Sequence, residues 1–338
     1  MQLGLKSYRL SEEPLTILHF EFVCDMLVSS SLLFEKCYGK YAIAAINIWC
    51  MEQVHALFMA AHHAKAPFIV QMTPIALQYG PMEMLLSMIR AAAEIYPGTV
   101  FAIHLDHGNR QAVREAISSG GFTSVMIDAS HESYSQNVAI TKAIVEEAHA
   151  MEVEVEAELG ILSGVEDNLE IKEADSNFTK PDEVEDFVSR TGCDSLAVAI
   201  GTSHGAYKFS GDQTLKFHIL EEIRNRLPRF PLVLHGGSEV DSEEVKRINN
   251  TGGNVGTLAK GVPPMEIKKA ITYGICKVNI ATDARMIWTR VHREYFAMHP
   301  EQFDPVPPGK IYMDELVKLY IEKFRLLGAT DKSGEFKA

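Results

Sequence analysis

The sequence predicts an α/β fold, a TIM (β/α)8 barrel in a single domain with a C-terminal helical extension. Eight short apolar runs alternate with stretches of helical spacing, and short connections join them, which is typical of a parallel sheet wrapped by helices. Polar residues fall at or just after the carboxyl end of almost every run, where the active sites of such barrels lie. A doubly wound open sheet would concentrate them at one switch point, so the pattern favours the closed barrel.

The elements follow one another along the chain in strand–helix order. A first helix begins at Ser29–Ser31, where serines that can cap a helix precede apolar residues at helical spacing. The predicted strands are Ala42–Ile48, Phe68–Gln71, Val100–Leu105, Ser124–Asp128, Val153–Glu158, Ser195–Ile200, Leu232–His235 and Cys276–Ile280. The predicted helices are Glu52–His63, Met82–Ala93, Ala112–Ser118, Val138–Ala150, Pro181–Thr191, Thr214–Leu227, Ser242–Asn250 and Asp283–Met298.

Residues 1–25 differ from the rest of the chain because they show no clear periodicity and contribute no motif. We expect them to form an N-terminal extension outside the core, and we expect the barrel to occupy residues 26–338.

Composition excludes several classes of function. The formal net charge of −13 argues against a nucleic acid or an acidic membrane as partner, because phosphate backbones select clustered Lys and Arg. Five widely spaced cysteines, odd in number, predict neither a disulfide framework nor a zinc knuckle. No apolar run reaches membrane-spanning length, and the N-terminus lacks the pattern of a signal peptide. We therefore expect a cytoplasmic protein.

The stretch Phe101–Gly108 ends an apolar run with two imidazoles, one carboxylate and a glycine. Such groups need partners when buried, and a metal and a substrate in a cavity can supply them. Strand alternation places His104 and Asp106 on one face, so His107 reaches the same cavity only if the chain turns there, which Gly108 permits. A buried histidine bonded to the backbone suits His104 better than the pair Asp106 and His107, which we interpret as functional.

Three histidines each follow an apolar strand and precede a glycine: His107, His204 and His235. Three neutral imidazoles that leave a coordination position open are an arrangement of catalytic zinc sites, where the metal acts as a Lewis acid. Given the barrel, these residues predict a zinc centre.

Glycine-rich turns follow the last strands of the predicted barrel. His204–Lys208 and His235–Ser238 offer backbone N–H groups, a hydroxyl and a lysine, and Asn279–Asp283 follows the eighth strand. These groups suit a phosphate monoester, which the late loops of barrels commonly bind. The alternative is that each glycine only ends a strand, but three such turns beside two histidines favour the phosphate site.

A set of segments becomes diagnostic when taken together. They are His104–His107, Gly121–Asp128, Val155–Gly160, Gly164–Asp167, Asp194–Lys208, His235–Ser238 and Cys276–Asp283. In combination they resemble the class II, metal-dependent fructose-bisphosphate and tagatose-bisphosphate aldolases. The resemblance runs from about Met26 to the C-terminus.

This resemblance implies aldol cleavage or condensation of a ketose 1,6-bisphosphate, with fructose 1,6-bisphosphate as the first expectation and dihydroxyacetone phosphate and glyceraldehyde 3-phosphate as products. It implies catalytic zinc, leaves open a second divalent or a monovalent cation, and implies a homodimer or homotetramer. The residues that match the family are Asp106 and Glu166 for proton transfer; His107, His204 and His235 for zinc; Asp128 and Glu158 for a second or alternative metal position; and Asn47, Thr73, Gly205, Lys208, Gly236, Gly237, Ser238, Asn279, Ile280, Ala281, Thr282 and Arg285 for substrate.

Individual roles also come from the resemblance. Asp106 would protonate the nascent aldehyde oxygen in condensation and take that proton back in cleavage, and Glu166 would move the proton at the ketose carbon. Arg285 matches a position that in some members reaches the other phosphate across a subunit interface.

Three positions depart from the family pattern. Ala281 stands where many fructose-bisphosphate members carry an aspartate, Glu239 replaces the glycine usual after the Gly-Gly-Ser turn, and Thr73 replaces a serine. Ala281 is similar to the tagatose-bisphosphate branch, whereas the segment Asn250–Pro264 resembles the longer fructose-bisphosphate forms. The sequence therefore leaves the sugar open.

Two rival functions remain at this point. Lys277 shares the inward face with Asn279 and is a candidate Schiff-base nucleophile, although pairing with an inward carboxylate such as Asp128 or Glu158 is favoured. A barrel that binds metal and phosphate without turnover is the second rival, motivated by Ala281 and Glu239.

Overall fold

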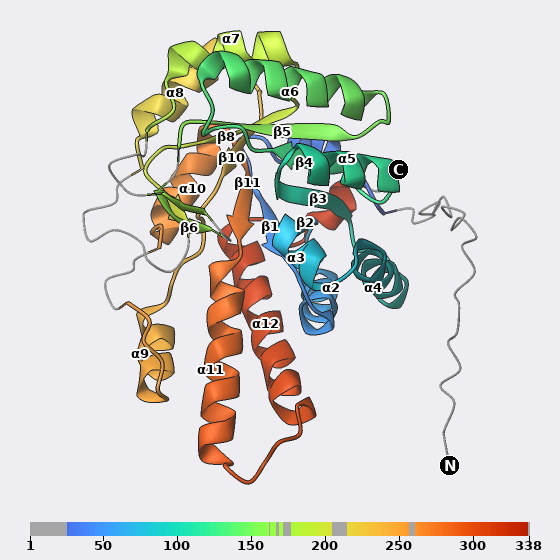
Figure 1. The fold of residues 1–338 in the computed structure, drawn as a ribbon, viewed down its shortest axis with the longest axis vertical. Coiled ribbons are helices and arrows are strands. Elements are labelled where there is room, and N and C mark those ends of the chain that lie inside the picture. The colour runs from blue at the N-terminus through green and yellow to red at the C-terminus, as the bar shows by residue number, and fades with distance from the viewer. Residues whose placement is uncertain are drawn as a thin grey trace, which may run out of the picture.

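A computed structural model describes residues 26–161, 163–166, 169–171, 177–204, 215–256 and 261–336. Eight parallel strands close into a barrel in the order β1-β11-β10-β8-β5-β4-β3-β2, which confirms the predicted TIM barrel (Figure 1). The strands are β1 Ile43–Asn47, β2 Phe68–Met72, β3 Phe101–Gly108, β4 Ser124–Ile127, β5 Glu154–Leu159, β8 Ser195–Val198, β10 Leu232–Leu234 and β11 Ile275–Ile280.

The helices surround this barrel, and several of them begin at a residue whose side chain caps the helix. The Ser29 hydroxyl accepts a hydrogen bond from the Leu32 backbone N–H, so the predicted serine cap is confirmed. The helices are α1 Ser30–Cys37, α2 Met51–Ala64, α3 Pro74–Tyr79, α4 Met82–Ile95, α5 Arg110–Ser119, α6 Tyr134–His149, α7 Pro181–Thr191, α8 Phe217–Arg226, α9 Ser242–Asn250, α10 Pro264–Thr272, α11 Thr282–Met298 and α12 Val306–Leu326, with a short 3-10 turn at Ser333–Phe336. The predicted bounds of α7 and α9 match, whereas α3 and α10 were not predicted.

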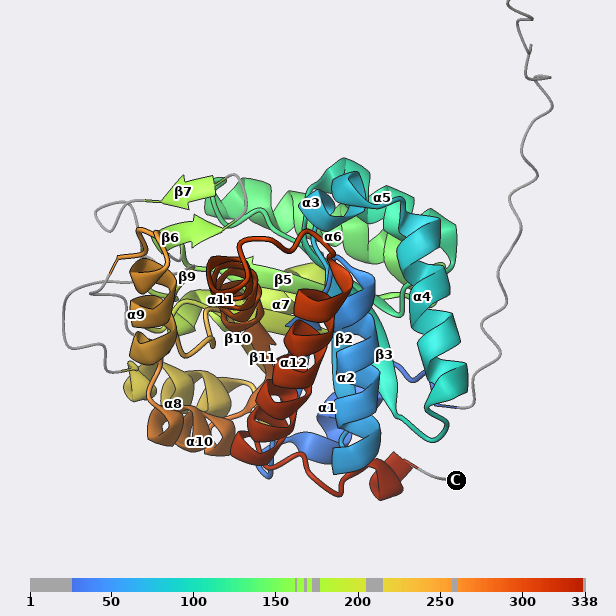
Figure 2. The same cartoon turned by 90° about the horizontal axis from the view of Figure 1, so that it is seen from below.

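Helices α11 and α12 form an arm that projects away from the barrel, and this arm is the predicted C-terminal helical extension (Figure 1). Viewed along the projection, α12 lies beside α2 as well as α11 (Figure 2). Exposed Phe303 and Val306 stand at the connection between the two helices. No helix among the described residues is long and apolar enough to cross a membrane.

A second, small sheet was absent from the prediction. It consists of β6 Ser163–Glu166, β7 Leu169–Ile171 and β9 Ser203–His204 in the order β7-β6-β9. Strands β6 and β9 are parallel, and Gly164 is paired with His204. This pairing joins the segment after β5 to the segment after β8, so two stretches with predicted site residues lie side by side.

The core has an apolar part between strands and helices and a polar part inside the barrel. Phe58, Phe68 and Phe101 pack with ring centroids 5.0–5.7 Å apart in the apolar part. Within the barrel, Glu156 and Lys277 are both buried and form an ion pair. The barrel interior below the mouth therefore contains a pair of opposite buried charges.

Candidate active site

The end of β3 contains a β-bulge that aims two neighbouring side chains at the barrel mouth. Leu105 pairs with Val125 and Gly108 with Ile127, so two residues of β3 stand opposite one residue of β4. His107 itself adopts a left-handed conformation with φ 47°, which a histidine tolerates in short turns. The chain turns here as predicted, but the left-handed residue is His107 and not Gly108. Gly108 instead provides close approach, because a Cβ there would lie 2.8 Å from the Met126 carbonyl oxygen.

Asp106 is completely buried and held by three side-chain amides. Its Oδ2 accepts hydrogen bonds from Asn47 Nδ2 at 2.9 Å and Gln71 Nε2 at 3.1 Å. Its Oδ1 accepts from Asn279 Nδ2 at 3.0 Å. The amides come from β1, β2 and β11, so three strands fix the orientation of this carboxyl group. Sequence reasoning missed Gln71, although its position at a strand end matches the signal that identified Asn47.

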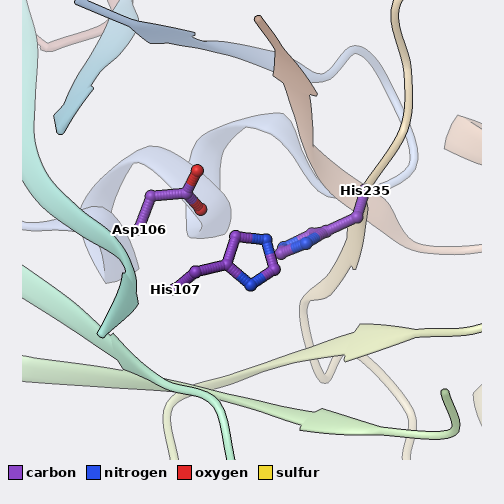
Figure 3. A group of neighbouring side chains, drawn as sticks. All are labelled: Asp106, His107 and His235. Atoms are coloured by element: carbon purple, nitrogen blue, oxygen red, sulfur yellow. The ribbon is translucent and has the colours of Figure 1, made fainter. Parts of the chain in front are cut away.

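Asp106, His107 and His235 converge at the mouth, with one potential ligand atom from each lying within 4.8 Å of the others. Figure 3 shows the two imidazole rings beside the carboxylate. The rings are 4.6 Å apart between centroids and nearly perpendicular, at 80°. These side chains come from β3 and from the residue that follows β10, so the fold brings together three residues predicted from strand ends.

His107 also belongs to a second group with Asp128 and Glu158, whose ligand atoms again lie within 4.8 Å of one another. The distance from His107 Nδ1 to Asp128 Oδ2 is 3.2 Å. Burial raises the pKa of Asp128, but the hydrogen bond and charge of His107 together with the hydrogen bonds from Ser130 outweigh burial and hold that pKa well below its usual range. An Nδ1–H that donates to Asp128 places the lone pair of His107 on Nε2.

His235 contacts a buried ion pair between Glu156 and Lys277. The sequence predicted a different partner for Lys277. The Nε2 of His235 is 3.0 Å from Glu156 Oε1, while Lys277 Nζ donates to Glu156 Oε2 at 2.7 Å. Burial lowers the pKa of His235, which favours the neutral imidazole that metals bind. Lys277 was expected to pair with Asp128 or Glu158, and its partner is Glu156. His104 was expected to bond to the backbone, but the partner of its Nδ1 is a side chain, the Ser124 hydroxyl, at 2.8 Å.

Two of the three turns predicted to hold a phosphate, His235–Ser238 and Asn279–Asp283, are cross-linked by hydrogen bonds. Ser238 Oγ accepts from the backbone N–H groups of Ala281 at 3.3 Å and Thr282 at 3.1 Å. Gly236 has φ 66°, and a Cβ on Gly237 would lie 2.4 Å from a Val278 methyl group, so the turn needs glycine at both positions. The Ile280 side chain, predicted to face substrate, is buried in the apolar core.

A cavity of about 710 Å³ adjoins the mouth, between α2, α3 and the α11–α12 arm. Asn47, Thr73 and Arg285, three residues of the predicted substrate set, line it. The guanidinium carbon of Arg285 stands 5.4 Å from the Trp49 ring centroid, a cation–π distance. The Thr73 hydroxyl caps α3 by accepting from the Ala76 N–H, a role that its sequence position did not suggest.

The remaining predicted residues are described only in part. His204 and Glu166 belong to β9 and β6, whose backbones are described. Gly205, Lys208 and residues 1–25 lie outside the described residues.

The donor set fits a divalent transition metal. Two imidazoles and a buried carboxylate, from His107, His235 and Asp106, are ligand types of zinc sites. One nitrogen of each imidazole lies beside a further carboxylate, which is the usual supporting contact of a zinc-binding histidine. Fold and site thus define a TIM barrel with a candidate metal site at the carboxyl ends of the strands.

Comparison with known proteins gives the family. The model of class-II fructose-bisphosphate aldolase matches residues 29–332, and the chain belongs to this family. It is 41% identical over 312 residues to the fructose-bisphosphate aldolase of Giardia intestinalis, covering 90% of this chain and 94% of that one. It is 42% identical over 308 residues to that of Thermus caldophilus, covering 90% and 99%. The solved YdjI aldolase of Escherichia coli K12 superposes with a TM-score of 0.71 at 27% identity, covering 91% of this chain and all of that one. The resemblance inferred from the motifs is confirmed.

Proposed function

We propose that the chain catalyses the reversible aldol cleavage of fructose 1,6-bisphosphate to dihydroxyacetone phosphate and glyceraldehyde 3-phosphate. The observation that carries the proposal is the convergence of Asp106, His107 and His235 at the mouth of a barrel of this family. The charge of the chain, −13, leaves a small phosphosugar rather than a nucleic acid as the ligand.

Zinc is the metal that we assign to this site, held by His107, His204 and His235. When bound, zinc supplies a Lewis acid that polarises the ketone of the substrate. Asp128 and Glu158 hold a second or alternative cation position, supported by their place beside His107. Glu156 and Asp128 orient the two described imidazoles toward the metal.

Two carboxyl groups divide the proton transfers in this proposal. Asp106 takes the proton of the substrate hydroxyl that becomes the aldehyde oxygen, and its three amide partners fix the orientation of the carboxyl group. Glu166 moves the proton at the ketose carbon. The pairing of β6 with β9 supports this role, because it keeps the segment of Glu166 beside that of His204.

The substrate is held at both ends. At the dihydroxyacetone phosphate end, backbone N–H groups and hydroxyls of the two cross-linked loops bind the phosphate. Arg285, whose position in some family members reaches across a subunit interface, is assigned to the other phosphate. The residues assigned to this binding are Asn47, Thr73, Gly205, Lys208, Gly236, Gly237, Ser238, Asn279, Ile280, Ala281, Thr282 and Arg285.

A second candidate substrate is tagatose 1,6-bisphosphate or a related ketose phosphate. Ala281 favours it, because a methyl group discriminates little between epimeric hydroxyls that a carboxylate would distinguish. The Schiff-base alternative loses support because Lys277 is tied to Glu156 at 2.7 Å inside the barrel.

The cellular setting is also part of the proposal. We assign the chain to sugar breakdown in the cytoplasm, with residues 1–25 outside the catalytic barrel. A homodimer or homotetramer is supported by exposed apolar side chains along the α11–α12 arm, including Trp288, Met298 and Ile311. Light scattering of the purified chain tests the oligomeric state.

The test of the function is cleavage of both ketose bisphosphates by the zinc-loaded protein, with triose phosphates measured as products. Turnover of fructose 1,6-bisphosphate supports the proposal, and selective turnover of the tagatose epimer supports the second candidate. Saturable binding of dihydroxyacetone phosphate without turnover of either sugar would identify a barrel that binds without catalysis and would refute the proposal.

A further inference from the structure

A buried lysine from the C-terminal arm reaches the back of the phosphate-binding turn. Lys323, on α12, is 4% exposed. Its Nζ lies 2.9 Å from Asp283 Oδ2 and 3.3 Å from Glu239 Oε2. Asp283 is itself buried, whereas the Glu239 side chain is about half exposed. The lysine thus joins α12 to the first turn of α11 and to the residue after Ser238.

Asp283 transmits this contact to the turn. Its Oδ1 accepts hydrogen bonds from the backbone N–H groups of Glu239 at 3.0 Å and Val240 at 3.1 Å. Val240 is held in a left-handed conformation with φ 49°, which a β-branched residue adopts only when surrounding contacts impose it. Since Ser238 accepts in turn from the backbone at 281 and 282, the two loops hold each other reciprocally.

The positive charge of Lys323 balances the negative charge of the carboxylates around it. Burial opposes the charge on Lys323, but Asp283 and Glu239 outweigh it and raise its pKa, so the amine is cationic at neutral pH. Without that cation, the buried carboxylate of Asp283 would stand uncompensated directly behind the turn. The Asp283 carboxylate would then repel a dianionic phosphate, and it would also lose the contact with Lys323 that orients it.

We propose that Lys323 is a positioning residue for phosphate binding, acting through Asp283 on the turn at 236–240, and that Glu239 is a half-exposed second partner of Lys323 rather than a disabling change. The proposal rests on the assignment of this turn to the phosphate of dihydroxyacetone phosphate. It makes the α11–α12 arm a part of substrate recognition as well as of the fold.

The test measures the Kd of dihydroxyacetone phosphate for the zinc-loaded protein by calorimetric titration, together with zinc content and Tm. Lys323→Met is expected to raise Kd by at least about tenfold at unchanged zinc content, because one compensating charge behind the turn is lost. Lys323→Arg keeps the charge and is expected to stay within about threefold of the native Kd. Glu239→Gln is expected to have a small effect, because its side chain is half exposed.

Phe324→Leu is the matched control, since Phe324 neighbours Lys323 on α12 but packs in the apolar core. It is expected to lower Tm and to leave Kd unchanged. A Lys323→Met protein that binds like the native chain overturns the inference, as does a Phe324→Leu protein that loses equal affinity. If Lys323→Met does not fold, Lys323→Gln takes its place. Equal Kd values of Lys323→Arg and Lys323→Gln for dihydroxyacetone phosphate would then overturn the inference. Native protein that binds no dihydroxyacetone phosphate refutes instead the assignment of the turn.

Discussion

Replacing Lys277 by methionine tests whether this amine stabilises the barrel or acts as a nucleophile. Its Nζ is 2.7 Å from Glu156 Oε2, and both side chains are at most 2% exposed. At an effective dielectric constant of 20, the attraction at this distance is about 6 kcal/mol, and breaking a buried pair by removing one partner typically costs about 3–5 kcal/mol. We therefore expect Lys277→Met to lower the free energy of unfolding by about 3–5 kcal/mol, because Glu156 is left as an uncompensated buried charge beside His104 and His235.

The assay is urea unfolding of the metal-free protein, so that bound metal does not contribute to stability. Lys277→Met combined with Glu156→Gln is expected to recover most of the loss, because no buried charge remains and the glutamine oxygen still accepts from His235. Lys318→Met, on an exposed lysine, is the control and should change stability by less than about 0.5 kcal/mol. A cost below about 1 kcal/mol for Lys277→Met, or a double variant no more stable than the single one, would refute this reasoning. Trapping of a covalent adduct on Lys277 by borohydride would show that it is a nucleophile.

Three further predictions concern the proton transfers, the N-terminus and the sugar. Asp106→Ala should keep proton exchange of dihydroxyacetone phosphate and lose carbon–carbon cleavage, whereas Glu166→Ala should lose exchange; equal loss of exchange in both variants would contradict the division of roles. A chain that begins at Met26 should keep its Tm and turnover, because the Met26 carbonyl still accepts from the Phe101 N–H at 3.1 Å; a large drop in Tm would show that residues 1–25 pack on the barrel. Ala281→Asp should raise the ratio of kcat/KM for fructose over tagatose 1,6-bisphosphate, and a native ratio already strongly in favour of fructose would show that other residues set the choice.

The barrel and most of its mouth could be predicted because strand ends carry a local signal. Apolar runs predicted the strand bounds to within two residues, except at β3, which extends three residues beyond its predicted end, and the capping residue Ser29 and the first-turn residue Pro181 marked helix starts. Asp106, His107 and His235 meet at the mouth because parallel strands deliver their carboxyl ends to one place.

What could not be predicted depends on register and on backbone conformation. The partner of Lys277 lies across the barrel on β5, and alternation alone cannot choose among the inward carboxylates of that strand. His107 supplies its own left-handed turn beside a glycine that looked better suited. The short pairing of β6 with β9 has too few residues to show a period, and the contact of Lys323 with Asp283 joins residues forty positions apart.

The central claim is that turnover depends on a metal held by His107 and His235, and one measurement tests it directly. Zinc content and fructose 1,6-bisphosphate cleavage are determined in the same sample before EDTA, after EDTA and after zinc is restored, for the native chain and for His107→Ala and His235→Ala. His63→Ala, on an exposed histidine of α2, is the control. We predict that native turnover falls and returns with zinc, that His63→Ala behaves like the native chain, and that both site variants lose tightly bound zinc and more than about 99% of turnover. Full activity in zinc-free native protein, or full activity of either site variant, would contradict the account.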